Sequence, residues 1–189
     1  MMTISIVVAV MVIVLVYGIV LYNGLVRVKH NVSEAWANID IILKQRHDEL
    51  SKLVEVCRQY RDFEQSTLSR VIEARDAMQS ARQHQDVVRL GVVEGSLNHG
   101  LRRLFALAEA YPSLKADRIY LQLQRRIAAL ESALADRRER YNESVNINNI
   151  RLEQFPDVLV AGMCGFKAYD LLTFSTAELE DVDIRLLFS

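Results

Sequence analysis

The chain opens with a long apolar run, and no charged side chain occurs before Arg27. A helix needs about 20 apolar residues to cross the hydrocarbon core of a bilayer, and the stretch from Ile4 to Tyr22 has that length. No basic segment precedes the run and no small-x-small cleavage site ends it, which favours an uncleaved anchor over a cleavable signal peptide. We therefore predict a single-pass protein of the cell membrane, with residues 1–22 as the transmembrane anchor and the lipid bilayer as a partner.

After the anchor, apolar residues recur in alternating steps of three and four, the spacing of helices that pack side by side. A polar turn at residues 83–86 and Pro112 divide this part into antiparallel hairpins, which a parallel coiled-coil stalk would not allow. The predicted fold class is therefore all-α: an N-terminal transmembrane helix, then an up-and-down antiparallel four-helix bundle over residues 23–166. The predicted helices cover residues 23–60, 63–82, 87–110 and 117–154, the first being continuous with the anchor.

The starts of the last two helices depend on single residues. Asp117 is a plausible N-cap for the fourth helix, because an Asp side chain accepts hydrogen bonds from the first free N–H groups. Gly91, Gly95 and Gly100 each lower helix stability by up to about 1 kcal/mol relative to Ala. We therefore expect the start of the third helix to be frayed, or delayed to near Gly95.

Aligning the apolar faces of the first and fourth helices in antiparallel brings Trp36 opposite Tyr141. The same alignment places Leu25 opposite Leu152. Trp36 lies about 20 Å beyond Tyr22 along a helix, too far to act as an aromatic residue of the membrane interface. We therefore expect Trp36 and Tyr141 to pack together in the core.

Two arginines, Arg46 and Arg137, interrupt these apolar faces. The antiparallel alignment sets Arg46 opposite Glu131 and Arg137 opposite Asp40. A buried charge without a partner is unfavourable, so we predict two structural ion pairs that fix the register of the helices. The alternative is that both arginines extend along their aliphatic stems to solvent.

An apolar, glycine-bearing segment, Val158–Phe166, follows the end of the fourth helix. The returning helix should bring Phe155 and Pro156 level with Tyr22, so we predict that this segment, with Cys164 and Phe166, contacts lipid. The alternative is that it folds over the open end of the bundle. The tail, residues 167–189, is acidic; Ser175 and Glu178 form a possible capping box for a short helix, and a loosely ordered end is the alternative.

The residues give no sign of a catalytic, cofactor or metal site. The four histidines are scattered without metal-ligand spacing, and Cys57 and Cys164 form no CxxC motif. A formal net charge of −1 offers no basic field for nucleic acid. We therefore expect a protein that is not an enzyme and needs no cofactor.

Several patches, in order and at suitable spacing, resemble the LemA family of bacterial membrane proteins. The resemblance spans Tyr22 to Phe166 and implies an anchored four-helix bundle, without implying a chemistry. Two departures stand out: Leu50-Ser-Lys-Leu53 replaces a proline-containing stretch, which implies a straighter first helix, and Glu131-Ser-Ala replaces a Glu-Asn-Arg run. The patches are Tyr22-Asn-Gly-Leu-Val, Ala35-Trp36, Ile39-Asp40, Leu43-Lys44, Arg46, Glu73-Ala74-Arg75, Leu107-Ala-Glu-Ala-Tyr-Pro-Ser-Leu-Lys-Ala116, Leu121-Gln122-Leu123, Arg140-Tyr141-Asn142, Phe155-Pro156, Ala161 and Gly165-Phe166.

These observations favour a structural or interaction protein that presents its bundle to a membrane protein partner or to copies of itself, as a homo-oligomer. A membrane-shaping protein, acting on lipid through the anchor and residues 158–166, is the alternative. Arg27 and Lys29 follow the anchor, so the positive-inside rule places the bundle in the cytoplasm and the N-terminus outside.

Overall fold

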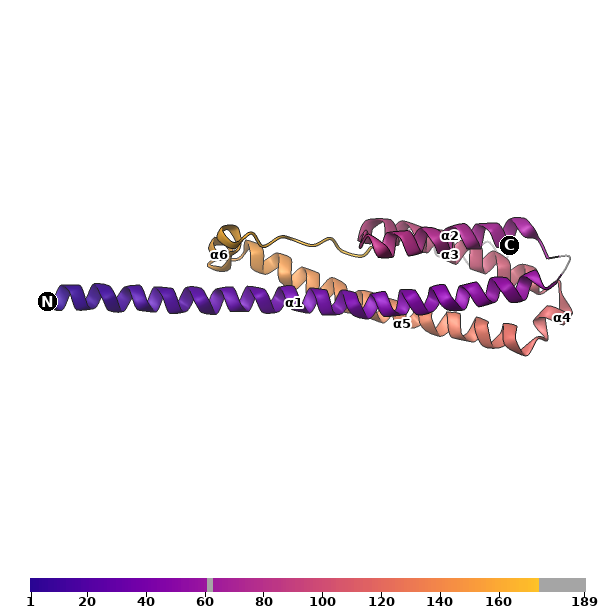
Figure 1. Cartoon of the computed structure of the whole chain (residues 1–189), viewed down its shortest axis with the longest axis horizontal. Helices are drawn as coiled ribbons and strands as arrows, with labels where there is room; N and C mark the ends of the chain where they lie inside the picture. Colours follow the sequence, from indigo (N-terminus) through magenta and orange to yellow (C-terminus); the bar gives the residue numbers. More distant parts are fainter. Residues whose placement is uncertain (61–62, 174–189) are drawn as a thin grey trace, which may run out of the picture. The chain divides into compact units, whose positions relative to one another are not determined.

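The computed structural model describes residues 1–60 and 63–173, and this part of the chain forms six helices and no strand (Figure 1). The all-α prediction is therefore confirmed. The four predicted helices correspond to α1, α2, α3 and α5, and two short helices, α4 and α6, are additional. The bounds are α1 Met2–Arg58, α2 Gln65–Gln83, α3 Val87–Ala108, α4 Pro112–Lys115, α5 Arg118–Glu153 and α6 Asp157–Cys164. The predicted capping box of Ser175 and Glu178 lies outside the described residues.

The apolar N-terminal stretch and the first helix of the folded part are one helix, α1, which runs for 57 residues without a break. The expected continuity of the first predicted helix with the apolar stretch is confirmed. Residues 50–53, where the departure from the family pattern implied a straighter helix, also lie within α1.

Asp side chains set the starts of α3 and α5. The side chain of Asp86 accepts a hydrogen bond from the Arg89 N–H, and α3 begins directly after it at Val87. The expected delay towards Gly95 is therefore wrong, because the cap and the buried face of α3 outweigh the low helix propensity of glycine. Asp117 caps α5 as predicted, accepting from the N–H groups of Ile119 and Tyr120 at 2.7 and 3.2 Å.

The chain divides into two compact units. Unit 1 comprises residues 1–37 and 139–171, and therefore holds the apolar half of α1, the end of α5 and α6. Unit 2 comprises residues 38–138 and, among the described residues, Leu172 and Thr173. Both long helices, α1 and α5, contribute to both units.

The core of unit 2 receives side chains from α1, α2, α3 and α5. Leu53, Leu68, Leu97 and Ile127, one from each helix, are all at most 1% exposed. Leu114 of α4 is also fully buried. The three-and-four spacing of apolar residues therefore marks the buried faces of these helices, as predicted.

Within each unit, α1 and α5 meet in antiparallel. In unit 2, Arg126 Nη1 of α5 donates to Glu49 Oε1 of α1 at 3.3 Å. In unit 1, the rings of Trp36 and Tyr141 meet at a centroid distance of 6.0 Å. The contact earlier in α1, at Trp36, is made by the later residue of α5, Tyr141, so the two helices run antiparallel. The pairing of Trp36 with Tyr141 is the predicted one.

Candidate functional site

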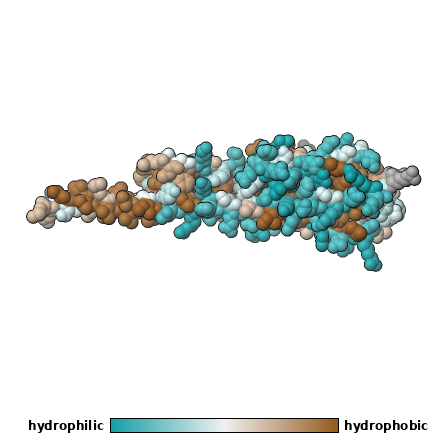
Figure 2. Space-filling view, in the orientation of Figure 1, coloured by the Kyte–Doolittle hydropathy of each residue, from teal (hydrophilic) through white to brown (hydrophobic). Residues whose placement is uncertain are grey.

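The apolar half of α1 is uncovered by protein. Its side chains from Met2 to Val20 stand mostly more than half exposed, and Ile13 and Leu15 are 66% and 63% exposed. In the described part of the chain, α1 is the one helix long and apolar enough to cross a membrane by length and composition. Figure 2 shows hydrophobic side chains along this end of the helix. A bare apolar surface of this kind needs a non-aqueous environment.

The short helix α6 lies beside the end of this apolar stretch. The rings of Tyr22 on α1 and Phe166 after α6 contact each other edge to face, with centroids 5.8 Å apart. Gly165 ends α6 in the left-handed region with φ 71°, a conformation that glycine adopts without strain. Phe166 therefore lies at the level of Tyr22, and the same level expected for Phe155 and Pro156 stays a prediction.

One face of α6 and the residue before Pro156 expose large apolar side chains. Phe155 is 75% exposed, Leu159 58% and Met163 89%, and Cys164 is exposed as well. With Val158 they form the α6 apolar face. Most of this segment therefore does not cap the core, and its predicted contact with lipid stays a prediction.

Arg151 of α5 fixes the position of α6 against α1. Its Nε donates to Asp157 Oδ2 at 2.7 Å, and Asp157 is buried. A Cβ placed on Gly24 would lie 2.9 Å from the same guanidinium group. The absence of a side chain at Gly24 therefore leaves room for Arg151 beside α1.

Residues 167–170 form a strap along the end of α5. The Asn149 side chain bonds both backbone groups of Tyr169: its Nδ2 donates to the carbonyl at 2.9 Å and its Oδ1 accepts from the N–H at 3.1 Å. The Tyr141 hydroxyl donates to the Asp170 carbonyl at 3.1 Å. These hydrogen bonds attach the start of the tail to α5. Burial raises the pKa of Tyr141 to about 12, so its hydroxyl stays protonated and remains a hydrogen-bond donor.

Trp36 and Tyr141 form the predicted aromatic contact, with their rings inclined at 63°. Tyr141 is buried, at 3% exposed, whereas Trp36 is half-buried. The pair therefore closes the side of the α1–α5 interface in unit 1 and does not sit at its centre.

Arg46 is fully buried in unit 2, and its partner is not the predicted one. Its Nη1 donates to Glu94 Oε1 and its Nη2 donates to Asn98 Oδ1, the latter at 2.7 Å. Both partners lie on α3, whereas the predicted partner, Glu131, is on α5 and exposed. The prediction considered only the α1–α5 interface, but Arg46 faces α3. Its zero exposure also excludes the alternative of a side chain extended to solvent.

The surroundings of Glu94 change the pKa of its carboxyl group. Glu94 is 3% exposed, and this burial raises the pKa of its carboxyl group, although the Arg46 guanidinium acts in the opposite direction. The charge of Glu131 raises the pKa of Glu94 further, so Glu131 lies near the pair without joining it. A polar residue within the otherwise apolar face of Leu90, Leu97 and Leu101 was the sequence signal that could have identified Glu94.

The second predicted ion pair is also replaced. Asp40 accepts from Arg82 Nη1 of α2 at 2.8 Å in place of Arg137. The Arg82 side chain is 15% exposed and that of Asp40 is 40% exposed, so this pair lies at the edge of unit 2. Arg137 is half-buried on α5.

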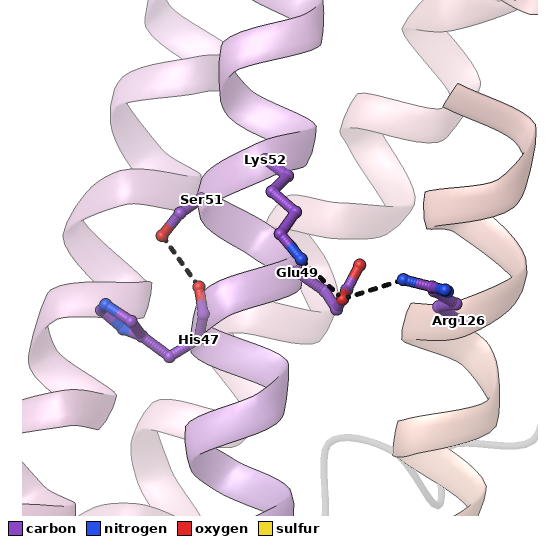
Figure 3. A network of polar contacts seen from close by, with 5 residues as sticks. All are labelled: His47, Glu49, Ser51, Lys52 and Arg126. Atoms are coloured by element: carbon purple, nitrogen blue, oxygen red, sulfur yellow. Dashed lines mark hydrogen bonds and ion pairs between the residues drawn. The ribbon is translucent and has the colours of Figure 1, made fainter. Parts of the chain in front are cut away.

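A polar network follows Arg46 along α1 and includes Arg126 of α5 (Figure 3). Glu49 Oε1 accepts from Lys52 Nζ at 3.0 Å and from Arg126 Nη1 at 3.3 Å. Ser51 Oγ donates to the His47 carbonyl at 2.8 Å. The contact between Glu49 and Arg126 joins α1 to α5, whereas the other two lie within α1.

Among the described residues, no group of three or more His, Cys, Asp or Glu side chains could hold a metal ion. Cys57 is buried, and this burial raises the pKa of its thiol to about 12. A thiol with that pKa is protonated at neutral pH and is a poor nucleophile. Cys57 therefore acts as a small apolar side chain of the core.

Comparison with known proteins assigns the chain to a family. A family model described as the LemA family matches residues 35–186. Protein LemA of Metamycoplasma hominis is 28% identical over 167 residues, covering 86% of this chain and 72% of the relative. Magnetosome protein MamQ 2 of Paramagnetospirillum magneticum is 31% identical over 74 residues, 39% of this chain and 27% of the relative.

Magnetosome protein MamQ of Magnetospirillum gryphiswaldense is 20% identical over 169 residues, covering 77% of this chain and 62% of the relative. The chain thus spans less than two thirds of the length of either magnetosome protein. The match to the family model, by contrast, covers most of the chain and reaches from α1 to beyond the strap. On that match, the chain belongs to the LemA family.

Proposed function

We propose that this protein is a non-catalytic, single-pass membrane protein that presents an up-and-down four-helix bundle for interaction with another membrane protein or with copies of itself. The observation that supports it best is the continuity of α1, which joins the uncovered apolar stretch to the core of unit 2 in one helix. The two parts are therefore joined by helix and not by a flexible linker. Arg27 and Lys29 favour a cytoplasmic bundle, with the N-terminus outside.

Chemical crosslinking of the full chain in intact cells, followed by detergent extraction, tests this function. The expected result is one dominant crosslinked species of fixed composition, either an oligomer of the chain or a complex with one partner. The matched control inserts a flexible Gly/Ser linker after Asn23, which keeps both the apolar stretch and the bundle but removes the continuity of α1. A chain that stays monomeric under all crosslinking conditions would contradict the proposal, and so would a linker variant with an unchanged pattern.

A second candidate function, the shaping of the membrane itself, is favoured by the α6 apolar face. The contact of Tyr22 with Phe166 holds this face at the end of the apolar stretch, where membrane and water would meet. An exposed apolar helix face at that level is stabilised by burial between lipid headgroups and acyl chains. The apolar half of α1 and α6 would then both act on the same leaflet.

Cys164, at the end of α6, provides the probe for lipid contact. In a Cys57→Ser chain labelled at Cys164 with an environment-sensitive dye, lipids that carry a quencher should strongly reduce the emission. The control carries Ser113→Cys as its single cysteine; the Ser113 carbonyl lies 3.3 Å from the Tyr60 hydroxyl, just past the opposite end of α1. Equal quenching at the two positions would contradict the proposed contact between α6 and lipid.

A further inference from the structure

The apolar half of α1 ends just before Gly24. At 1.5 Å per residue, the stretch from Ile4 to Tyr22 is about 27 Å long, close to the thickness of the hydrocarbon core of a bilayer, about 30 Å. Gly24 follows Tyr22 by only about 3 Å along the helix. When the apolar stretch crosses a bilayer, as proposed above, Gly24 therefore lies where acyl chains give way to phosphate headgroups.

A cationic group lies against α1 at this level. The Cβ that Gly24 lacks would be 2.9 Å from both Nη atoms of Arg151, so the end of the arginine side chain occupies the space beside this glycine. Asp157 Oδ2 accepts from Arg151 Nε at 2.7 Å. The guanidinium group is therefore held between α1 on one side and the start of α6 on the other.

Most of the hydrogen-bonding capacity of this guanidinium group is unused. An arginine carries five N–H donors, and within residues 1–60 and 63–173 Asp157 is the one hydrogen-bond and ion-pair partner of Arg151. The Arg151 side chain is 28% exposed, so a group from outside can reach its Nη atoms. Their planar arrangement matches two oxygens of a phosphate group.

Two further basic residues, Arg27 and Lys167, lie near the same level and are exposed. Arg27 stands three residues after Gly24, on the next turn of the same side of α1. Lys167 directly follows Phe166, whose ring contacts that of Tyr22. Three cationic side chains from three parts of unit 1 therefore surround the end of the apolar stretch.

The balance of charge in this region favours an anion. In the described part of the chain, neither Arg27 nor Lys167 forms an ion pair. The nearby acidic residues are Asp157, which pairs with Arg151, and the exposed Glu153 at the end of α5. Three positive charges thus face two negative ones, and a headgroup with a net negative charge is attracted.

The α6 apolar face decides between a phospholipid and a free phosphate ion. This face begins beside Asp157, the partner of Arg151, and exposes Leu159 and Met163. A phospholipid brings a phosphate group to Arg151 and acyl chains to the apolar side chains. A phosphate ion would leave these side chains in contact with water.

We propose that Arg151, with Arg27 and Lys167, binds the phosphate group of an anionic phospholipid, whose acyl chains lie on the α6 apolar face. Gly24 leaves the space in which the guanidinium group receives the phosphate. The inference rests on the proposed function in the membrane and adds a specific lipid partner to it.

Native mass spectrometry of the full chain in mild detergent tests the proposal. The two probes are phosphatidylglycerol and a diacylglycerol with the same acyl chains, which lacks the phosphate group. One molecule of phosphatidylglycerol should remain bound to each chain, whereas the diacylglycerol should be lost. Inorganic phosphate at the same concentration should not displace the bound lipid. Equal retention of the two probes would overturn the role of the phosphate group, and displacement by inorganic phosphate would overturn the assignment to a lipid.

Gly24→Ala and Gly18→Ala form a matched pair of variants on α1. The new methyl group at position 24 displaces the Arg151 guanidinium group, whereas at position 18 it meets no atom within 4 Å. Gly24→Ala should weaken the binding of phosphatidylglycerol by at least about tenfold, the effect of losing one hydrogen bond to a charged group. Gly18→Ala should leave the binding unchanged. Equal binding by the two variants would overturn the proposal.

A second variant removes charge at exposed positions only. Arg27→Gln with Lys167→Gln should weaken the binding by about fivefold for each charge removed, and unchanged binding would contradict their part in the site. Alkaline extraction of cells separates this inference from the proposed function. A chain in the membrane pellet that does not prefer phosphatidylglycerol contradicts the lipid site alone, whereas a chain absent from the pellet contradicts the proposed function and the lipid site together.

Discussion

Replacing Glu94 with alanine should lower the free energy of unfolding by about 3–5 kcal/mol, the typical effect of removing one member of a buried ion pair. Arg46 is fully buried and donates to Glu94 and Asn98. Without the carboxylate, its positive charge would stay in the core of unit 2 with only a neutral amide as partner. Guanidinium denaturation of the full chain in detergent, followed by circular dichroism, measures the change.

Glu131→Ala is the matched control, because Glu131 is a carboxylate of the same type on the exposed face of α5. Its effect should stay within about 0.5 kcal/mol, as for most surface substitutions. A double variant, Arg46→Met with Glu94→Leu, should recover most of the lost stability, since an apolar pair of similar volume often replaces a buried ion pair without loss. Equal effects of Glu94→Ala and Glu131→Ala would show that the pair is wrongly assigned.

Placing arginines in the middle of the apolar stretch should release the protein from the membrane. Each arginine near the centre of a membrane-spanning helix opposes insertion by about 2.5–3.5 kcal/mol, so Val10→Arg with Ile13→Arg together should oppose it by about 5–7 kcal/mol. Both side chains are more than half exposed, and the packing of the folded parts is therefore unaffected. Fractionation of cells with alkaline extraction measures the shift from pellet to supernatant.

Ser33→Arg serves as the control for added charge, because Ser33 is exposed on the same helix outside the apolar stretch. It should leave the protein in the membrane pellet. If the double arginine variant also remains in the pellet after alkaline extraction, the apolar half of α1 is not the element that inserts. The α6 apolar face would then be the next candidate for membrane attachment.

The amino-acid sequence was a good guide where the structure depends on periodic burial. The apolar faces of α1 and α5 repeat regularly, so their antiparallel alignment correctly paired Trp36 with Tyr141. The cap at Asp117 was predictable because its hydrogen bonds are local. Asp86 has the same local role at the start of α3, but the three glycines behind it suggested a later start.

The partners of single polar side chains could not be predicted in the same way. Arg46 lies on α1 between two neighbouring helices, and the spacing of apolar residues does not say which of them it faces. Glu94 interrupts the apolar face of α3 by one residue, a signal visible only when every helix face is compared. The bonds from Asn149 to Tyr169 join a side chain to irregular backbone and leave no periodic pattern in the sequence.

The antiparallel pairing of α1 with α5 also determines when the protein can fold during its synthesis. α2 and α3 are neighbours in the chain and can associate as soon as both have left the ribosome. The side of α1 that meets α5, by contrast, waits for that helix, because Arg126 follows its partner Glu49 by 77 residues. At about 5–20 residues per second this delay is about 4–15 s. During that time the buried face of α1 is open to chaperones, while its apolar end is already available to the machinery that inserts membrane proteins.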